Sequence, residues 1–326
     1  MNKIVECVPN YSVGSNTEII AKIIAPFQNT PNVSLVNVES DDDYNRTVVT
    51  VLGEPEAVCY AMVLSCKQAS LYIDMTKHKG EHLRMGATDV IPFIPIRNMS
   101  IEECVELSKK CAEMIYQETN IPIFLYSHSA TREHCKALPN IRKGQFEGMF
   151  EKLKDPMWTP DYGTTVHPTA GVSAVGCRPL LVAFNVDLDT NDKNIALQIA
   201  RAVRHSGGGY AYVQATVAYI DQKDIYQVTM NITDYTKTSV YRAFEAVRME
   251  ARRYHVEVIG SEFIGLVALD CLKDIAAYYL HLPSKEDVDL SLSDTVKVVC
   301  ENFLVHGFSD QKVIEYHLKE ELYVDR

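Results

Sequence analysis

The chain has 326 residues, enough for two domains of ordinary size, and 47% of them are hydrophobic, as in globular proteins. The formal net charge of −11 excludes a surface that follows nucleic-acid phosphates, so we expect no nucleic-acid partner. No apolar run is long enough to cross a bilayer, and the N-terminus lacks the apolar core of a signal peptide. We therefore expect a cytoplasmic protein with no membrane partner.

Nine cysteines are scattered through the chain, and their spacing is neither that of a disulfide framework nor that of a zinc site. Several fall on apolar positions of expected helices. Cysteines of this kind are usually small core residues in a reducing compartment. We therefore expect free thiols and no bound metal.

The first half of the chain is predicted to alternate strands and helices. Ser15 with Glu18, and Ser100 with Glu103, have the spacing of a capping box, so helices are expected to begin at both places. A further helical pattern follows Pro55. Strands are expected at residues 4–8, 33–38, 47–52, 90–96 and 121–126. The strand at 90–96 contains two prolines, which cannot donate to a ladder, so it is expected to be an edge strand or irregular.

The second half is predicted to follow the same order: strand, helix, two strands, helix, strand. Its strands are expected at residues 180–186, 210–220, 225–232 and 256–260. This order is that of a ferredoxin-like unit. We predict an α+β fold of two ferredoxin-like (βαββαβ) subdomains, residues 1–178 and 179–326, packed sheet to sheet with a ligand tunnel between them. Alternating Gln227, Thr229 and Asn231 predict a polar sheet face that is either solvated or lines a cleft.

Residues 74–89, DMTKHKGEHLRMGATD, gather histidines, glycines and cations in one connection of an otherwise acidic chain. His78, Glu81 and His82 match H-x-x-E-H, a zinc-peptidase pattern that requires a helix. Gly80 between the histidines disfavours that helix, since glycine costs about 1 kcal/mol relative to alanine in a helix interior. The alternative is acid–base chemistry by a histidine, with neighbouring cations holding an anionic substrate.

The run KHKGEHLRMGATDVIPFIP, residues 77–95, closely resembles the signature of the formiminotransferase family. Shorter segments resemble the family in the same order, so the resemblance covers essentially the whole chain; they are residues 5–12, 45–48, 160–163, 171–178 and 258–262. The family comprises glutamate formimidoyltransferases, which are found alone in bacteria or fused to a cyclodeaminase in animals.

The resemblance implies transfer of a formimino group from N-formimino-L-glutamate to tetrahydrofolate in histidine degradation, giving 5-formiminotetrahydrofolate and L-glutamate. It implies ferredoxin-like halves with a folate tunnel between them, a homodimer, and His82 as the catalytic acid–base residue. It places the folate at Gly163, Thr164, Thr165, Val166, His167, Pro168, Thr169, Ala170, Gly171 and Val172. Our further candidates for substrate binding are Glu39, Arg46, His78, Lys79, Arg84 and Asp89.

These further candidates have different expected roles. The formimino group is cationic, so a carboxylate such as Glu39 or Asp89 is expected to stabilise it. The cations Arg46, Lys79 and Arg84 are expected to hold the carboxylates of the substrate or of the folate tail.

The chain departs from the family pattern at three positions. Leu83 stands where proline is usual, Glu39 where aspartate is common, and Cys177 where alanine is common. None of these changes removes a reacting group. Three alternatives remain open: a glutamate formyltransferase using N-formylglutamate and 5-formyltetrahydrofolate, a zinc hydrolase acting through His78 and His82, and a non-catalytic folate-binding module.

Overall fold

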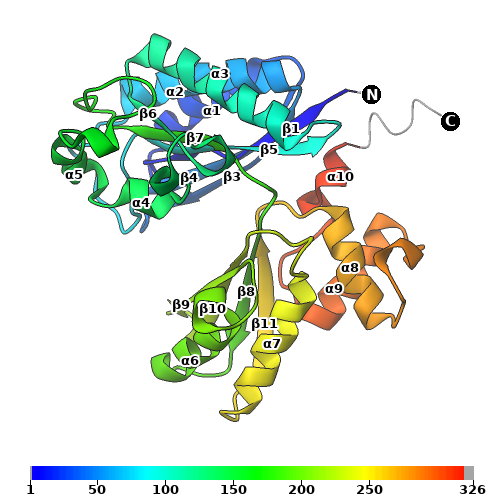
Figure 1. Ribbon diagram of the computed structural model, residues 1–326. Coiled ribbons are helices and arrows are strands. Elements are labelled where there is room, and N and C mark those ends of the chain that lie inside the picture. The colour runs from blue at the N-terminus through cyan, green and yellow to red at the C-terminus, as the bar shows by residue number, and fades with distance from the viewer. Residues whose placement is uncertain (1, 319–326) are drawn as a thin grey trace. The chain divides into compact units, whose positions relative to one another are not determined.

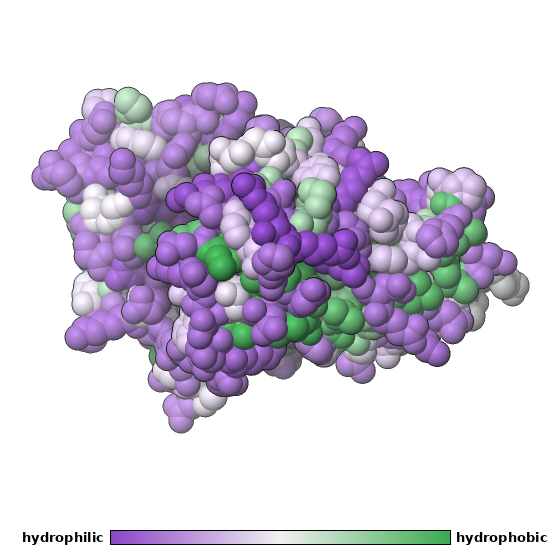
Figure 2. Space-filling model, turned by 90° about the horizontal axis from the view of Figure 1, so that it is seen from below, coloured by the Kyte–Doolittle hydropathy of each residue, from purple (hydrophilic) through white to green (hydrophobic). Residues whose placement is uncertain are grey.

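The computed structural model of the protein describes residues 2–318. The chain divides into two compact units, Met1–Pro179 and Leu180–Arg326, called unit 1 and unit 2 below. Each unit combines a β-sheet with helices (Figure 1), so the expected α+β class is confirmed. Within the described part of the chain, no helix has the length and apolar character needed to span a membrane. The face drawn in Figure 2 is mostly hydrophilic, with smaller hydrophobic patches.

Unit 1 is built on a seven-stranded sheet. Its strands are β1 (Ile4–Cys7), β2 (Asn10–Tyr11), β3 (Val33–Asp41), β4 (Arg46–Gly53), β5 (Thr88–Arg97), β6 (Ile123–Leu125) and β7 (Ser173–Cys177). β1 and β2 both lie between β4 and β5, while β3 extends the sheet beyond β4. β7 and β6 extend it beyond β5 with parallel pairing, and the other pairs are antiparallel.

Three long helices lie on one face of this sheet (Figure 1): α1 (Thr17–Asn29), α2 (Pro55–Tyr72) and α3 (Ile101–Thr119). Each carries a stripe of apolar residues that packs against the strands, because these residues recur at helical spacing. All nine cysteines of the chain are free thiols, and eight of them are buried. The expectation that they are core residues is confirmed.

The opposite face of the sheet is partly covered by residues 127–165, a segment that gave no clear sequence pattern. It contains the short helices α4 (Leu138–Arg142) and α5 (Gln145–Lys152) and the 3₁₀ turns η1 (Ser127–Ser129), η2 (Glu133–Cys135) and η3 (Pro156–Trp158). Ile141 and Met149 of these helices are fully buried in a cluster with Met85, Val90 and Phe124. The cluster fixes α4 and α5 beside the start of β5.

β5 is an inner strand, so the expectation of an edge strand is wrong. Pro92 lies opposite the break between β1 and β2, and its carbonyl accepts from Val8 N (3.2 Å). Pro95 lies beyond Phe93, where the pairing with β7 ends. Each proline therefore stands where no neighbouring strand needs its N–H, which is why an inner strand tolerates both.

The two predicted capping boxes have different outcomes. Ser100 caps α3 with the full reciprocal pair that includes Glu103, as expected. α1 is instead capped by Asn16, one residue later than expected, and the Asn16 side chain accepts from Ile19 N (3.0 Å). Asparagine is as good a cap as serine, so the sequence alone did not separate the two positions.

Unit 2 has a four-stranded antiparallel sheet in the order β11-β8-β10-β9. Its strands are β8 (Val182–Leu188), β9 (Val213–Ile220), β10 (Ile225–Ile232) and β11 (Val258–Ile264). Its helices and 3₁₀ turns are α6 (Lys193–Val203), η4 (His205–Gly207), α7 (Val240–Arg252), α8 (Leu269–Tyr279), η5 (Lys285–Asp287), α9 (Leu292–Phe303), η6 (Asp310–Lys312) and α10 (Ile314–His317). Phe184, Phe244 and Phe303 pack against one another in its core.

The other face of the unit 2 sheet is polar. Val228 and Met230 point into the core, and the residues that alternate with them along β10 point the other way, as the sequence predicted. Gln227 on that polar face donates through Nε2 to Asp187 (2.7 Å) and Glu262 (2.9 Å). The face is therefore organised by hydrogen bonds between strands.

The two units share an order of elements. Unit 2 begins β8-α6-β9-β10-α7-β11, and unit 1 contains the corresponding order β1-α1-β3-β4-α2-β5. In both sheets the first of these strands pairs with the third and the fourth, and the second pairs with the third. Unit 1 adds β2, β6, β7 and α3 to this arrangement.

Candidate active site

The stretch between α2 and β5 is an irregular loop. It lies against the turn between β3 and β4, where Asn45 Nδ2 donates to the Lys79 carbonyl (2.8 Å). Glu81 N donates to the Asp43 carbonyl in the same turn (3.1 Å). The expectation of a loop is confirmed, and the helix that the zinc-peptidase pattern requires is not formed.

The second predicted segment, residues 163–172, runs beside this loop. Ala87 N donates to the Ala170 carbonyl (2.9 Å), and Val172 N donates to the Met85 carbonyl (3.1 Å). These contacts are between main chains, so they fix the two segments whatever side chains they carry. The structure thus brings together the two stretches that the sequence singled out.

Two glycines permit this close approach. A Cβ on Gly86 would overlap the carbonyl oxygen of Val172, and a Cβ on Gly171 would overlap that of Met85. Gly171 also has φ +72°, a left-handed conformation that residues with a side chain rarely adopt. Glycine is therefore required at both contact points.

His167 organises the turn within the second segment. Its Nδ1 accepts from Ala170 N (2.9 Å), and its main chain pairs with that of Gly171. Burial lowers the pKa of His167, and the accepted hydrogen bond requires an unprotonated Nδ1. His167 is thus held as a neutral ring, while Thr164 and Pro168 are exposed.

His82 is buried on the loop, with 9% of its surface exposed. Among the residues that the structure describes, its Nε2 has no hydrogen-bond partner. The nearest carboxylate oxygen is Oδ2 of Asp89, at 3.8 Å, which is too far for a hydrogen bond. A buried polar atom without a partner is costly, so its presence is itself a sign of function.

Asp89 is completely buried at the start of β5. Its Oδ1 accepts from Met85 N (2.8 Å), and its Oδ2 accepts from Nε (2.8 Å) and Nη2 of Arg142. The pairing of β2 with β5 skips Asp89, since Tyr11 pairs with Thr88 and Asn10, the residue before it, pairs with Val90. Asp89 is thus the extra residue of a β-bulge, and its carboxylate reaches Arg142 of α4.

Arg46, at the start of β4, adds a second guanidinium to this group. Burial lowers the pKa of Arg46, and the positive charge of Arg142 lowers it further, whereas Asp89 acts in the opposite direction. Arg46 Nε is buried and lacks a partner in the described part of the chain. Asp41 also acts on Arg46, so what suits an anionic ligand here is the buried donor of Arg46 that has no partner.

Arg84 is nearly buried and is held by other side chains. Its guanidinium forms a bidentate pair with Glu147 (2.7 and 3.0 Å) and also donates to Gln145 (3.0 Å). Its Nε donates to Nδ1 of His78 (3.2 Å). The expected binding of a substrate carboxylate by Arg84 stays a prediction, and it requires that a ligand compete with Glu147.

Both ring nitrogens of His78 are engaged. Because Nδ1 accepts from Arg84, Nε2 carries the proton and donates to the Asn45 carbonyl (2.9 Å). Burial is the main cause that lowers the pKa of His78, so the ring is held neutral. Among residues 2–318 there is no group of three histidine, cysteine or acidic side chains that could hold a metal ion. His78 therefore anchors the loop, and the geometry offers no support for a zinc ion shared with His82.

Glu39 and Lys79 complete the predicted set. Glu39 lies on β3 and accepts from Asn37 (2.8 Å). The β3–β4 register places it on the same sheet face as Arg46, opposite the three long helices. Lys79 is exposed on the loop. The binding roles of both residues stay predictions.

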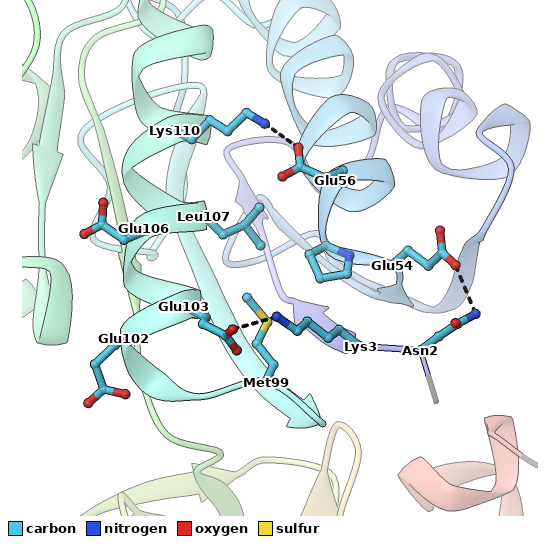
Figure 3. Close-up of a pocket in the computed structure, with 11 residues that line it drawn as sticks. Asn2, Lys3, Glu54, Glu56, Met99, Glu102, Glu103, Glu106, Leu107 and Lys110 are labelled. Carbon is cyan, nitrogen blue, oxygen red and sulfur yellow. Dashed lines mark hydrogen bonds and ion pairs between the residues drawn. The ribbon is translucent and has the colours of Figure 1, made fainter.

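A cavity of about 790 Å³ elsewhere in unit 1 contains none of the predicted site residues. It lies near the N-terminal ends of α2 and α3 (Figure 3) and is lined by Asn2, Lys3, Glu54, Pro55, Glu56, Met99, Glu102, Glu103, Glu106, Leu107 and Lys110. Its two lysines are paired with Glu103 (2.6 Å) and Glu56 (2.5 Å). The remaining carboxylates leave it acidic, so it does not suit an anionic substrate.

The sequence prediction missed two residues of the site, Arg142 and Glu147. Both lie on short helices of the segment that gave no pattern, and each binds a side chain more than 50 residues away. Their only sequence signal is charge in a polar stretch, which most surface residues share.

Comparison with known proteins finds a match for nearly the whole chain. The model of the formiminotransferase domain, N-terminal subdomain, matches residues 4–178, and that of the formiminotransferase domain matches residues 183–319. A glutamate formimidoyltransferase of Streptococcus pyogenes is 50% identical over 306 residues, 94% of this chain and 100% of that protein. That of Thermoplasma acidophilum is 39% identical, covering 86% of this chain and 93% of that protein. The formimidoyltransferase-cyclodeaminase of Mus musculus is 41% identical over 86% of this chain, which spans 53% of that longer protein.

Proposed function

Since the chain belongs to the formiminotransferase domain family, we propose that it transfers the formimino group of N-formimino-L-glutamate to tetrahydrofolate. The products are 5-formiminotetrahydrofolate and L-glutamate. One observation carries the proposal in this chain: a buried, unpartnered imidazole nitrogen of His82 lies in a loop that is hydrogen-bonded to residues 163–172. The curated relatives above are named formimidoyltransferases, which favours formimino over formyl as the transferred group.

His82 is the proton-transfer residue in this proposal. The N5 amine of tetrahydrofolate attacks the formimino carbon, and a C–N bond forms to give a tetrahedral intermediate. His82 accepts the proton lost from N5 and returns it to the glutamate nitrogen as the original C–N bond breaks. A ring nitrogen that no other group occupies is the first requirement of this role, and His82 Nε2 has no hydrogen-bond partner among the described residues.

Arg46 holds a substrate carboxylate in the same proposal. Its Nε is buried and has no hydrogen-bond partner among the described residues, so it can donate to an incoming carboxylate. Glu39 on the same sheet face stabilises the cationic formimino group. Residues 163–172 contact the folate, which the main-chain pairing keeps next to His82. Holding both substrates in one orientation supplies a large part of the rate acceleration of a bimolecular transfer.

We also propose that both units are ferredoxin-like, with a boundary near residues 178 and 179 and a folate tunnel between their sheets. The strand order shared by the two units and the polar sheet face of unit 2 support this. A homodimer is part of the proposal because the family resemblance implies it, and the cytoplasmic location expected from the sequence is kept in the proposal.

A two-donor transfer assay tests the function. The purified chain is given tetrahydrofolate with either formiminoglutamate or formylglutamate. We expect turnover with the formimino donor, and His82→Ala is expected to reduce it by about 10²- to 10⁴-fold. His128→Ala, which removes an exposed histidine on η1, is the matched control and should keep wild-type turnover. Near-normal turnover by His82→Ala would overturn the role of His82, and turnover with the formyl donor alone would overturn the proposed reaction.

A further inference from the structure

We propose that Arg142 and Asp89 act as a positioning pair for His82. Arg142 neutralises the carboxylate that faces the imidazole, so that His82 keeps a free lone pair for the substrate proton. This inference rests on the proposed function, and it gives Asp89 a different role from the binding of the formimino cation. Neither residue needs to touch the substrate for the pair to act.

The carboxylate of Asp89 has little capacity left for His82. Two nitrogens of Arg142 bind Oδ2, and Met85 N binds Oδ1. His82 Nε2 therefore lies 3.8 Å from Oδ2 of Asp89, too far to form a hydrogen bond. An aspartate that lacked this arginine would attract the protonated imidazole, and a protonated ring cannot accept a proton.

Arg142 is itself held in place from two sides. Its neighbour Ile141 is fully buried against Met85. Lys152 Nζ donates to the carbonyls of Ile141 (2.6 Å), Asn140 (2.7 Å) and Lys143 (3.1 Å), which fixes the end of α4. Such support is what a residue needs in order to hold a partner in one orientation.

The charged groups around His82 explain why the Arg142–Asp89 pair matters for the imidazole. Asp89 on β5 approaches His82 directly, and Arg142 on α4 pairs with Asp89. Arg46 on β4 interacts with Arg142, Asp41 and Asp89, while His78 and Arg84 lie on the same loop as His82. Arg84 is balanced by Glu147 and His78 is neutral, so both contribute little net charge. Arg142 is the residue whose loss would leave the carboxylate that faces His82 without its ion-pair partner.

The proposal predicts opposite effects for its two members. Arg142→Gln exposes the negative charge of Asp89 to His82, so the ring should titrate at higher pH. Asp89→Asn removes that charge and leaves the arginines, so the ring should titrate at lower pH. The double variant removes both charges and should titrate close to wild type. A charged group that close to an imidazole, without a partner of opposite charge, shifts the midpoint of the ring's titration by about 1 pH unit or more.

Two readouts on the full chain test the pair: NMR titration of the His82 ring signal, assigned by its loss in His82→Ala, and the pH profile of kcat/KM for formimino transfer. We expect the acidic limb of the profile to move with the NMR midpoint, by about tenfold in kcat/KM for each unit below the midpoint. Arg142→Lys should bring the midpoint back toward wild type. Arg132→Gln, which removes the arginine partner of Asp161, is the matched control and should leave it unchanged.

The outcomes separate the two proposals. Equal shifts in one direction, or no shift in either single variant, would refute the positioning pair even if the wild type transfers the formimino group. Opposite shifts in a chain without transferase activity would leave the pair standing and refute the proposed function. A fall in activity with an unchanged midpoint would mean a structural role only, and would also refute the pair.

Discussion

Glu6 is a buried carboxyl group whose replacement should make unit 1 more stable above neutral pH. It lies in β1 between Leu52 of β4 and Ile94 of β5, and 3% of its surface is exposed. Burial raises the pKa of Glu6 to about 7 from its ordinary value of 4.5, and the positive charge of Arg178 opposes the rise. Glu6→Gln keeps the shape of the side chain and removes its ionisation.

The expected size follows from proton linkage. Below pH 4.5 Glu6 is protonated in both the folded and unfolded states, so its ionisation does not lower the free energy of unfolding. Between pH 4.5 and 7 the unfolded state loses the proton while the folded state keeps it, so the free energy of unfolding falls as pH rises. Above pH 7 the free energy of unfolding has fallen by its full amount, about 3 kcal/mol, because each unit of pKa shift corresponds to about 1.36 kcal/mol. Glu6→Gln avoids this loss, so its advantage over wild type should grow by about 2 to 3 kcal/mol between pH 5 and pH 8.

Urea unfolding followed by tryptophan fluorescence measures this directly, because Trp158 in unit 1 is the single tryptophan of the chain. The comparison between the two pH values cancels any effect of the substitution that does not depend on pH. Glu113→Gln on the exposed side of α3 is the control, and its difference from wild type should not change with pH. A Glu6→Gln advantage that is equal at pH 5 and pH 8 would refute the reasoning.

Two further predictions concern the contacts of the loop. Gly171→Ala should destabilise unit 1 by more than about 2 kcal/mol, because of its φ of +72° and the overlap with the Met85 carbonyl, and should lower Tm by about 4 °C or more. Gly148→Ala, in α5 with open space at its Cβ, should instead stabilise slightly; equal Tm values for the two variants would contradict this account. Glu147→Gln should cost about 1 kcal/mol at pH 7, since Glu147 is largely exposed. Arg84 lowers the pKa of Glu147, so this difference should disappear as pH falls through that lowered pKa, and a difference that persists in acid would contradict the pairing.

The sequence predicted what depends on local pattern. The loop at 74–89, the long helices and most strands follow from periodicity and from glycine, and the structure confirms them. Of the two alternatives predicted for β5, the edge strand is wrong and the irregular strand is confirmed by its register shifts. The rule on proline is local, whereas the gap opposite Pro92 is set by how β1 and β2 meet β5. The register of a sheet is a property of several segments at once.

For the same reason, the sequence predicted several candidate site residues but not the side chains that pair with them. Arg84 resembled a free cation in the sequence, but the structure pairs it with Glu147 of α5. Asp89 resembled a ligand for a cation, but its charge is taken by Arg142 of α4. Both partners lie on helices of five and eight residues, which are too short for a periodic pattern to reveal.

The pairing of residues 74–89 with residues 163–172 also bears on how the protein folds. The contacts at Gly86 and Gly171 join parts of unit 1 that lie far apart in the sequence, so they contribute strongly to contact order. Closing so long a loop costs chain entropy before the contacts that offset this cost have formed. During synthesis, a nascent chain that ends before residue 163 already contains His82 and its flanking strands, but it lacks the segment that fixes them. The site therefore forms late, after the helical layer of unit 1 has had time to pack.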